Sequence, residues 1–363
     1  MENTNRESRR GWKRTVLIVL CVVLALIMFA MLFATVYINS LFDRIKGLDS
    51  ETLSSEQIES IYKETDAIDP NFTGPSLSGD DVTWSTDPVD TIGGENIINI
   101  LLIGQDRREG EGRQRSDAMI LCTINKRERT VTLTSFMRDM YVKIPGHRGN
   151  KINACYQIGG MPLLNSCLES NFGIHVDGNI EVDFNGFMDI VDLLGGVDME
   201  LTQAEANYLN HRGNWGVSEN DAWQLTKGVN RLNGSQALAY SRIRMIAAEE
   251  DELGRSDSDF GRTSRQRRML SALLERFKSM GLSDMNKVMP LLNKMVDLIA
   301  TDMDKGQIIQ YVAEVLPLLS ELKIETLRIP ADGMYYEANV DGLDAIVPNL
   351  QKNNQLLKEK LTE

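Results

Sequence analysis

Two carboxylates and an arginine stand where the apolar pattern predicts the ends of buried strands. Asp106 and Asp117 flank one glycine-rich loop between two apolar runs, and Arg138 directly follows a third run. Ionisable residues on loops at strand ends are typical of ligand sites in α/β proteins. Paired carboxylates commonly hold a hydrated Mg²⁺ that bridges phosphates, and the arginine fork grips two phosphate oxygens at once. Together these residue types indicate a divalent cation and a phosphate-rich ligand.

A second group of polar residues lies about a hundred residues later in the chain. Arg242 and Arg244 are two residues apart, so in an extended segment both side chains would project to one face. Arg262 and Gln266 are four residues apart and share one face of a predicted helix. Arg262 falls in the first turn of that helix, where free backbone N–H groups and the helix dipole favour an anion.

Each of these residues also has an ordinary structural interpretation. Asp117 follows Ser116 and suits a turn, whereas Arg138 beside Asp139 suits an ion pair. Solvated positions or pairs with glutamate suit the remaining arginines of both stretches, which are Arg107, Arg108, Arg113, Arg265, Arg267 and Arg268. Spacing alone therefore leaves a pyrophosphate site and an ordinary charged surface both open.

The apolar pattern around these residues predicts alternating strands and helices. Short runs of β-branched residues and leucine indicate buried strands, and three- or four-residue apolar spacing indicates helices. The expected strands are 97–103, 118–124, 131–137, 176–182, 197–201 and 324–329. The expected helices are 152–156, 163–171, 184–194 and 260–280, with two or three more after 283, and 232–244 is expected to be a helix that runs into an extended end. The pattern of 203–234 is more typical of an elaborated loop. The acidic stretch 246–259 is expected to be a mobile loop.

Residues 15–38 carry no charge, and these 24 residues exceed the roughly 20 that a helix needs to cross a bilayer. The alternative is a cleaved signal peptide, whose apolar core would be about 7–15 residues long and would end in a small-residue cleavage site. Basic residues concentrate in 1–14, which predicts a cytoplasmic amino terminus. We therefore expect a single-pass protein of the cell membrane, with a transmembrane helix 15–38, an extracellular stalk or linker 39–94 and an extracellular folded domain 95–355.

Charge and cysteine content limit the function further. The net charge of −13, together with the expected position outside the membrane, excludes a basic protein that binds nucleic acid. The cysteine spacing and the three histidines fit no zinc pattern. Cys122 suits a buried small hydrophobe. Cys155 and Cys167 flank a Gly-Gly turn and could form a disulfide outside the cell, with two free thiols as an equal alternative.

Seven segments in the same order resemble the motifs of the LytR-CpsA-Psr family of membrane-anchored cell-wall enzymes. They are NILLIGQDRR, RSDAMIL, SFMRDMYVKIPG, KINACYQIGG, VDFNGFMDIVDLLGGVDMEL, LNGSQALAYSRIR and DFGRTSRQRRML. The resemblance covers roughly residues 96–275 and continues less clearly to about 350. One such segment would be a weak signal, but seven in order behind one predicted membrane anchor resemble the family closely.

The resemblance implies a phosphotransferase that moves a glycopolymer from a polyprenyl-pyrophosphate carrier to peptidoglycan, forming a phosphodiester with a muramic acid hydroxyl. It implies an α/β fold with a central mixed β-sheet flanked by helices, behind a single N-terminal transmembrane helix. A deep apolar cavity for the lipid tail would be lined by the apolar faces of 184–194 and 266–277. The implied partners are the polyprenyl-pyrophosphate-linked glycan, peptidoglycan and, through the N-terminal helix, the lipid bilayer.

Position in the family's motifs also implies residue roles. Asp106 and Asp117 would bind Mg²⁺, with Mn²⁺ as an alternative. The pyrophosphate would be held by Arg115, Arg138, Lys151, Arg242, Arg244, Arg262 and Gln266. Catalysis would fall to Asp106, Arg138 and Arg262, and either Asp106 or Asp139 could serve as the base.

Two other functions fit the same residues. One is a hydrolase that passes the phosphoryl group to water, and the other is a non-catalytic surface regulator that only binds polyprenyl-phosphate lipids. An enzyme is favoured because a lipid-binding regulator needs no pair of metal ligands, whereas the chain has the complete set of Asp106, Asp117, Arg138, Arg242, Arg244 and Arg262. The chain departs from the family's usual residues at Ala118, at Phe136-Met137 and in the acidic insertion 247–259. The transferred polymer stays open between teichoic acid, capsule and another wall polysaccharide.

Overall fold

The computed structural model describes residues 40, 44, 52–64, 72–84, 89–105, 112–211, 223–244, 246, 259–279 and 294–362. The chain divides into two compact units, Met1–Ile45 and Lys46–Glu363, and the description below concerns the second. The predicted transmembrane helix 15–38, Asp106 and most of the acidic stretch 246–259 lie outside the described residues. Within those residues, no helix combines the length and the apolar character that a bilayer crossing requires.

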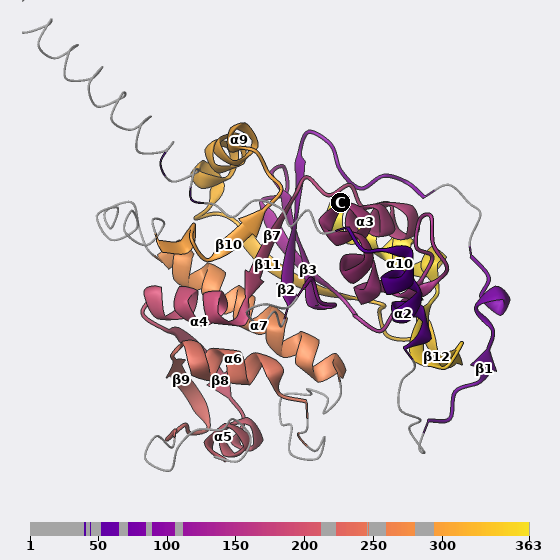
Figure 1. Ribbon diagram of the computed structural model, residues 1–363. Coiled ribbons are helices and arrows are strands. Elements are labelled where there is room, and N and C mark those ends of the chain that lie inside the picture. The colour runs from indigo at the N-terminus through magenta and orange to yellow at the C-terminus, as the bar shows by residue number, and fades with distance from the viewer. Residues whose placement is uncertain are drawn as a thin grey trace, which may run out of the picture. The chain divides into compact units, whose positions relative to one another are not determined.

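A mixed sheet of six strands forms the centre of the second unit (Figure 1). In spatial order the strands are β10 (Ile299–Thr301), β7 (Gly178–Asp183), β2 (Ile97–Gln105), β3 (Ser116–Asn125), β4 (Thr130–Phe136) and β11 (Lys323–Ile329). β7 is parallel to β2 and β11 is parallel to β4, whereas the other three pairs are antiparallel. The predicted mixed sheet is confirmed, and five of its strands match predicted strands to within two residues at each end.

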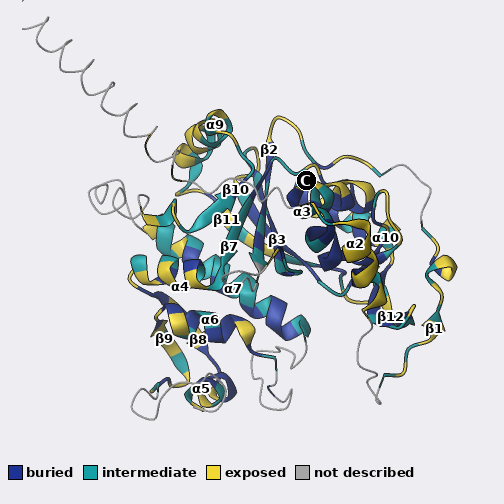
Figure 2. Cartoon of the chain, in the orientation of Figure 1, coloured by how far each residue is buried: buried dark blue, intermediate teal, exposed yellow. Residues whose placement is uncertain are grey.

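Helices cover both faces of this sheet. They are α2 (Ser55–Lys63), α3 (Ile152–Phe172), α4 (Phe184–Leu193), α5 (Gln203–Asn210), α6 (Gly234–Arg242), α7 (Asp259–Ser279), α9 (Lys305–Val315) and α10 (Leu350–Thr362). Successive side chains of a strand point to opposite faces. Leu101 and Leu121 therefore pack with α2, α3 and α10 in the main core, while Leu102 and Ile120 face α7 and α9. Buried residues concentrate where these layers meet (Figure 2).

The described part of the unit also contains three smaller sheets and two short 3-10 helices. The sheet strands are β1 (Ser76–Leu77), β12 (Tyr335–Val340) and β13 (Leu343–Pro348) in one, β5 (Tyr141–Val142) and β6 (Asn150–Lys151) in another, and β8 (Val197–Leu201) and β9 (Gly228–Leu232) in the last. The 3-10 helices are η1 (Gly79–Asp81) and η6 (Leu316–Leu318). The strands β10, β12 and β13 were not predicted from the apolar pattern.

The prediction of a loop over 203–234 is wrong for much of its described part. The Thr202 hydroxyl accepts a hydrogen bond from the Glu205 N–H at 3.1 Å, and the Glu205 carboxylate accepts one from the Thr202 N–H at 3.0 Å. This reciprocal pair is a capping box, and it starts α5. Further along, β9 pairs with β8 in antiparallel register. The local signal for α5 was therefore present in the sequence as Thr-x-x-Glu.

Part of the segment 39–94, expected to be a largely irregular stalk, is folded against the domain. Ile61 of α2 and Ile92 are 3% and 1% exposed and belong to the main core. Leu77 of β1 pairs with Val340 of β12 in parallel register. Apolar residues from this segment therefore contribute to the core of the unit.

A kink at Gly160 separates the two helices predicted at 152–156 and 163–171. The backbone there has φ 64° and ψ −154°, a conformation that glycine adopts far more readily than other residues. Cys155 and Cys167 lie on the two sides of the kink, are fully buried, and form a disulfide. Of the two alternatives, the structure thus has the disulfide.

Some arginines of the two basic stretches have structural partners, as the ordinary interpretation predicts. Arg265 and Glu205 are both fully buried and form an ion pair, with Arg265 Nε 2.9 Å from Glu205 Oε1. Arg113 is 6% exposed and donates to the carbonyl oxygens of Gln157 and Ile158, each at 3.1 Å. These side chains hold α7 and the β2–β3 connection in place.

We predict that Arg265→Met lowers the free energy of unfolding by about 3–5 kcal/mol, because it leaves the buried Glu205 carboxylate without this cation. The double variant with Glu205→Gln should lose less than Arg265→Met alone, since no buried charge is then left behind. Chemical denaturation of the full chain measures both. The control is Asp198→Asn, which removes an exposed partner of Arg231 and should change the midpoint little. Equal losses in the single and double variants would contradict the prediction.

Candidate functional site

Charged side chains from three elements meet at one end of the central sheet. Arg138 follows β4 and donates from Nη1 to Asp117 Oδ1 of β3 at 2.7 Å. Arg138 Nε is also 3.5 Å from Asp139 Oδ2, and Asp139 Oδ1 is 3.3 Å from Lys151 Nζ at the end of β6. The structure thus brings together three of the predicted site residues, with Asp139 between two cations.

Asp259, which the sequence analysis did not assign, joins the second basic stretch to this group. Its Oδ1 lies 2.7 Å from Arg262 Nη2, 3.8 Å from Arg244 Nε and 3.9 Å from Arg138 Nε. Asp259 and Arg262 are three residues apart in the first turn of α7, a spacing that brings helical side chains together. That spacing was the available signal. We call these seven residues the charged cluster: Asp117, Arg138, Asp139, Lys151, Arg244, Asp259 and Arg262.

The charges of the cluster shift the pKa values of its arginines in opposite directions. Burial lowers the pKa of Arg138, but the carboxylates of Asp139, Asp259 and Asp117 outweigh it, so the pKa is raised. The pKa of Arg262 is lowered, first by burial and then by the cations of Arg138 and Arg244, which Asp259 only partly offsets. The charged form of Arg262 therefore has less stabilisation from its surroundings than that of Arg138.

Several polar atoms of the cluster are buried without a hydrogen bond among the described residues. They are Nε of Arg138, Nε and Nη2 of Arg262, and both carboxylate oxygens of Asp259. Buried polar groups are normally hydrogen-bonded, so unsatisfied N–H groups at one point mark a place for an acceptor. Because these N–H groups belong to guanidinium ions, the acceptor that fits them is an anion such as a phosphate.

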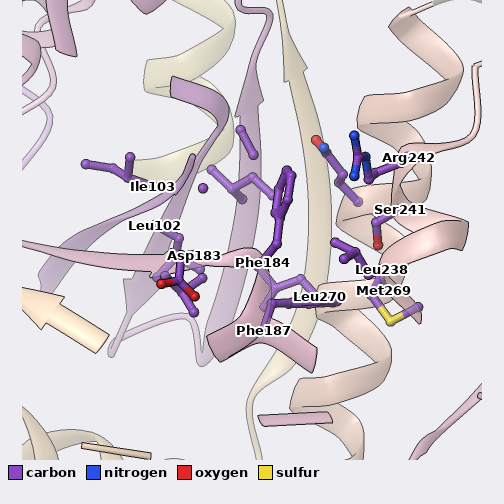
Figure 3. A pocket seen from close by; sticks show the side chains of 15 residues that line it. Leu102, Ile103, Asp183, Phe184, Phe187, Leu238, Ser241, Arg242, Met269 and Leu270 are labelled. Atoms are coloured by element: carbon purple, nitrogen blue, oxygen red, sulfur yellow. The ribbon is translucent and has the colours of Figure 1, made fainter. Parts of the chain in front are cut away.

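An apolar cavity of about 150 Å³ opens beside the cluster, between the sheet and α4, α6 and α7. Figure 3 shows Phe184 and Phe187 of α4 on one side of it, with Leu238 of α6 and Leu270 of α7 on the other. Leu102 and Ile120 contribute the sheet side. Of the two ranges predicted to line a lipid cavity, 184–194 contributes Phe184 and Phe187 to this cavity, and 266–277 contributes Gln266, Met269 and Leu270.

Small residues keep the sheet side of the cavity open. Gly104 and Ala118 are partners in the β2–β3 register, and both line the cavity. A Cβ atom on Gly104 would lie 3.3 Å from the Cβ of Ala118, so there is little room for a larger side chain between the strands. Asp183 also lines the wall, but its carboxylate accepts from the Gly186 N–H at 2.7 Å and caps α4.

Two predicted phosphate ligands lie at the cavity rather than in the cluster. Arg242 and Gln266 both line it, and the Arg242 guanidinium is 4.8 Å from the centre of the Phe184 ring. The expectation of an extended segment with Arg242 and Arg244 on one face is corrected here, because Arg242 ends α6 and Arg244 instead faces Asp259. Gln266 is one helical turn after Arg262, so α7 connects the cavity to the cluster.

The remaining predicted residues lie at the edge of this site or beyond the description. Arg115 Nη2 is 2.7 Å from Glu64 Oε2, and its Nε donates to Gln157 Oε1 at 3.2 Å. Asp106 lies outside the described residues, directly after Gln105, which pairs with Ser116 next to Asp117. Within the described part of the chain, no group of three or more His, Cys, Asp or Glu side chains could hold a metal ion.

The other arginines named in the sequence analysis do not enter the cluster. Arg268 donates from Nη2 to the Glu200 carbonyl oxygen at 3.3 Å. Burial and, to a smaller extent, the nearby Arg328 cation together lower the pKa of Arg267 to about 10. Arg107 and Arg108 lie outside the described residues.

Comparison with known proteins agrees with the fold. The Bacillus subtilis (strain 168) polyisoprenyl-teichoic acid–peptidoglycan teichoic acid transferase TagT is 29% identical over 271 residues, 72% of this chain and 78% of the relative. The TagU transferase of Bacillus licheniformis is 32% identical over 262 residues, covering 70% and 78%. A solved structure of TagT bound to LIIa-WTA matches with a TM-score of 0.57 and 28% identity, covering 79% of this chain and 97% of that one. The family model matches residues 62–360, and the chain belongs to the LytR_cpsA_psr family.

Proposed function

We propose that the chain is a membrane-anchored phosphotransferase that moves a glycopolymer from a polyprenyl-pyrophosphate carrier to peptidoglycan, with formation of a phosphodiester. The observation that carries this proposal is the meeting of a buried arginine cluster with an apolar cavity along one helix, α7. One amphiphilic ligand fits both parts, because its diphosphate suits the cluster and its hydrocarbon tail suits the cavity.

The relatives support the same substrates. Both TagT and TagU are named as transferases that act on polyisoprenyl-teichoic acid and peptidoglycan, and TagT has been solved bound to LIIa-WTA. These names favour a teichoic acid as the polymer that this chain transfers. Capsule and other wall polysaccharides remain the alternatives for the polymer.

In the proposed reaction, an acceptor hydroxyl attacks the glycan-proximal phosphorus of the diphosphate. A new P–O bond to the acceptor forms as the bond to the carrier-side phosphate oxygen breaks, and polyprenyl phosphate leaves. Arg138, Arg244 and Arg262 would hold the diphosphate and balance the charge that builds up on the leaving phosphate. The proton of the acceptor hydroxyl would pass to Asp139 or Asp106.

The same proposal includes a divalent cation, Mg²⁺ or Mn²⁺, held by Asp117 and Asp106. Mg²⁺ usually binds one or two carboxylates together with substrate phosphates and water, so this small set suffices in principle. Asp117 fits this role, since its side chain is 33% exposed and stands in the cluster. Bound there, the cation would neutralise diphosphate oxygens during transfer.

The proposed place of the enzyme is the outer side of the cell membrane, with residues 1–14 in the cytoplasm and residues 15–38 across the bilayer. The basic residues before 15 and the uncharged run that follows support this orientation. A substrate that is itself held in the bilayer by its polyprenyl chain is consistent with a tethered enzyme.

The first test uses the full chain in detergent with a synthetic polyprenyl-pyrophosphate disaccharide, peptidoglycan oligomers and Mg²⁺. We expect a phosphodiester product by mass spectrometry that disappears on chelation of the metal. Asp117→Asn and Arg262→Lys should each lower turnover by about 10²–10³-fold, since each removes a charge or a bidentate contact at the diphosphate. Arg268→Lys on the same helix is the matched control and should stay near wild type.

The outcomes of this assay separate the three candidate functions. Release of sugar phosphate at a rate independent of peptidoglycan would favour the hydrolase. Binding of the lipid without turnover under any metal condition would favour the surface regulator. Either result would contradict the transferase.

A second prediction concerns the cavity. Ala118→Leu should raise the KM for a long-chain polyprenyl donor about tenfold while changing that for a short-chain donor little, because the added atoms fill the apolar space. Ala313→Leu, on the exposed side of α9, is the matched control. Thermal melting verifies that both variants fold. Equal effects of Ala118→Leu on the two donors would show that the tail binds elsewhere.

A third prediction tests the orientation in intact cells by cysteine labelling. Tyr336→Cys places a thiol at a position that is 48% exposed on the domain, and Ser8→Cys places one in the expected cytoplasmic segment. Burial raises the pKa of the Cys122 thiol to about 12, so its background reactivity should be low. A membrane-impermeant maleimide should label Tyr336→Cys in intact cells, and Ser8→Cys only after lysis. The reverse pattern would overturn the orientation.

A further inference from the structure

A second cavity, of about 580 Å³, lies at the β5–β6 hairpin, apart from the apolar one. Its described lining combines aromatic rings with charged groups of both signs. The aromatic members are Tyr62, Trp84 and Tyr141. We call this space the hairpin pocket. Neither the proposed lipid site nor the diphosphate site uses it.

The aromatic wall of the hairpin pocket is held rigidly. Trp84 stacks on Tyr141 with ring centres 5.9 Å apart and planes 14° apart. Tyr141 is 2% exposed, and a Cβ atom on Gly149 would lie 2.9 Å from its ring, so the ring is packed closely on that side as well. Trp84 itself is only partly buried. A fixed, partly exposed indole is a platform on which an apolar ring face can pack.

A second aromatic edge is fixed by Arg148. Its guanidinium lies 4.5 Å from the centre of the Tyr62 ring, and the Tyr62 hydroxyl donates to the Arg148 carbonyl oxygen at 2.9 Å. Burial raises the pKa of both Tyr62 and Tyr141 to about 12, so neither hydroxyl ionises at physiological pH. The wall therefore adds no negative charge of its own.

The charged groups of the hairpin pocket are of both signs. Lys143, His147 and Arg148 supply hydrogen-bond donors, and Asp80 and Asp341 supply acceptors. The charged cluster, in contrast, gathers four cations around three carboxylates with unsatisfied guanidinium N–H groups. A pocket with mixed donors and acceptors next to aromatic rings suits a ligand that is neutral, rich in hydroxyl and amide groups, and apolar on its ring faces. Amino-sugar rings have this chemistry.

The hairpin pocket lies next to the reacting centre. Asp139 lies in the turn that follows β4, two residues before Tyr141, the first residue of β5. Tyr141 also pairs with Lys151, whose Nζ is 3.3 Å from Asp139 Oδ1. The β5–β6 hairpin therefore contributes Tyr141 and Asn150 to the hairpin pocket and Lys151 to the charged cluster.

We infer that the hairpin pocket binds the glycan strand of the acceptor and holds it so that a sugar hydroxyl meets the diphosphate at Asp139. This inference rests on the proposed transferase function and adds the place of its second substrate. Trp84 and Tyr62 supply ring faces for the sugars, while Asp80, Arg148 and Asp341 bond their hydroxyl and amide groups. Binding two substrates at adjoining sites turns their reaction into an effectively unimolecular step.

The test uses the full chain in detergent and a tetrasaccharide of alternating N-acetylglucosamine and N-acetylmuramic acid without stem peptides. Titration calorimetry without donor measures its Kd, and initial rates with donor measure KM for each substrate. Trp84→Leu and Arg148→Gln should each weaken tetrasaccharide binding and raise the acceptor KM about five- to tenfold, with the donor KM unchanged. Trp84→Phe keeps an aromatic face and should recover most of the loss.

Matched controls are Tyr336→Leu and Arg127→Gln, which change exposed residues outside the pocket and should behave as wild type. Arg148 is 65% exposed, so its variant tests the pocket even if a Trp84 variant fails to fold. Unchanged Kd and acceptor KM in the folded pocket variants would overturn the inference. So would competition by free stem peptide, which would indicate a peptide ligand. Tetrasaccharide binding that depends on Arg148 without any transfer would support the pocket and contradict the transferase.

Discussion

The buried charge at the end of the central sheet is the constraint on which the site depends. Arg262 is 5% exposed at its side chain, and a buried cation is costly unless a counter-charge accompanies it. Asp259 supplies that charge to Arg262 and Arg244, and Asp117 supplies it to Arg138. The cations of the site are thus held in place by its own carboxylates. A phosphate that enters can replace part of this internal pairing, so little reorganisation is needed when charge develops.

The helix α7 sets the order in which polar and apolar groups meet a ligand. Gln266 is four residues after Arg262, and Met269 and Leu270 are three and four residues after Gln266, so these side chains share one side of the helix. At 1.5 Å per residue, the eight residues from Arg262 to Leu270 span about 12 Å. Within that length the surroundings change from the charged cluster to the apolar cavity. On the opposing sheet, the Gly104–Ala118 pair has side chains too small to fill the cavity. The cavity therefore depends both on α7 and on the strand register that pairs these two residues.

The sequence predicted the central strands well because each is a short apolar run with a clear end. It also placed Arg138, Asp117 and Arg262 together through the family's motifs. The pairing of Asp259 with Arg262 could have been read from their three-residue spacing, but its contacts with Arg138 and Arg244 depend on the packing of α7 near the end of β4, which no local pattern reveals. The prediction that Arg242 and Arg244 share one face was wrong because α6 continues to Arg242. The Arg242 side chain then packs on Phe184, whereas that of Arg244 lies near Asp259. The strands β12 and β13 were also missed, because their pairing depends on the surrounding fold and not on a local apolar pattern.

The β5–β6 hairpin gives a physical reason why this site suits transfer more than hydrolysis. Water needs no pocket, because it reaches any exposed phosphorus at high concentration. A sugar hydroxyl competes with water only if its ring is held close to the phosphorus, where its effective concentration can exceed that of the solvent. Asp139 stands between Arg138 on the diphosphate side and Lys151 at the base of the hairpin. In the transferase proposed above, the same short hairpin would link Asp139 at the reacting centre to the aromatic wall, an arrangement that serves a two-substrate transferase and that a hydrolase does not require.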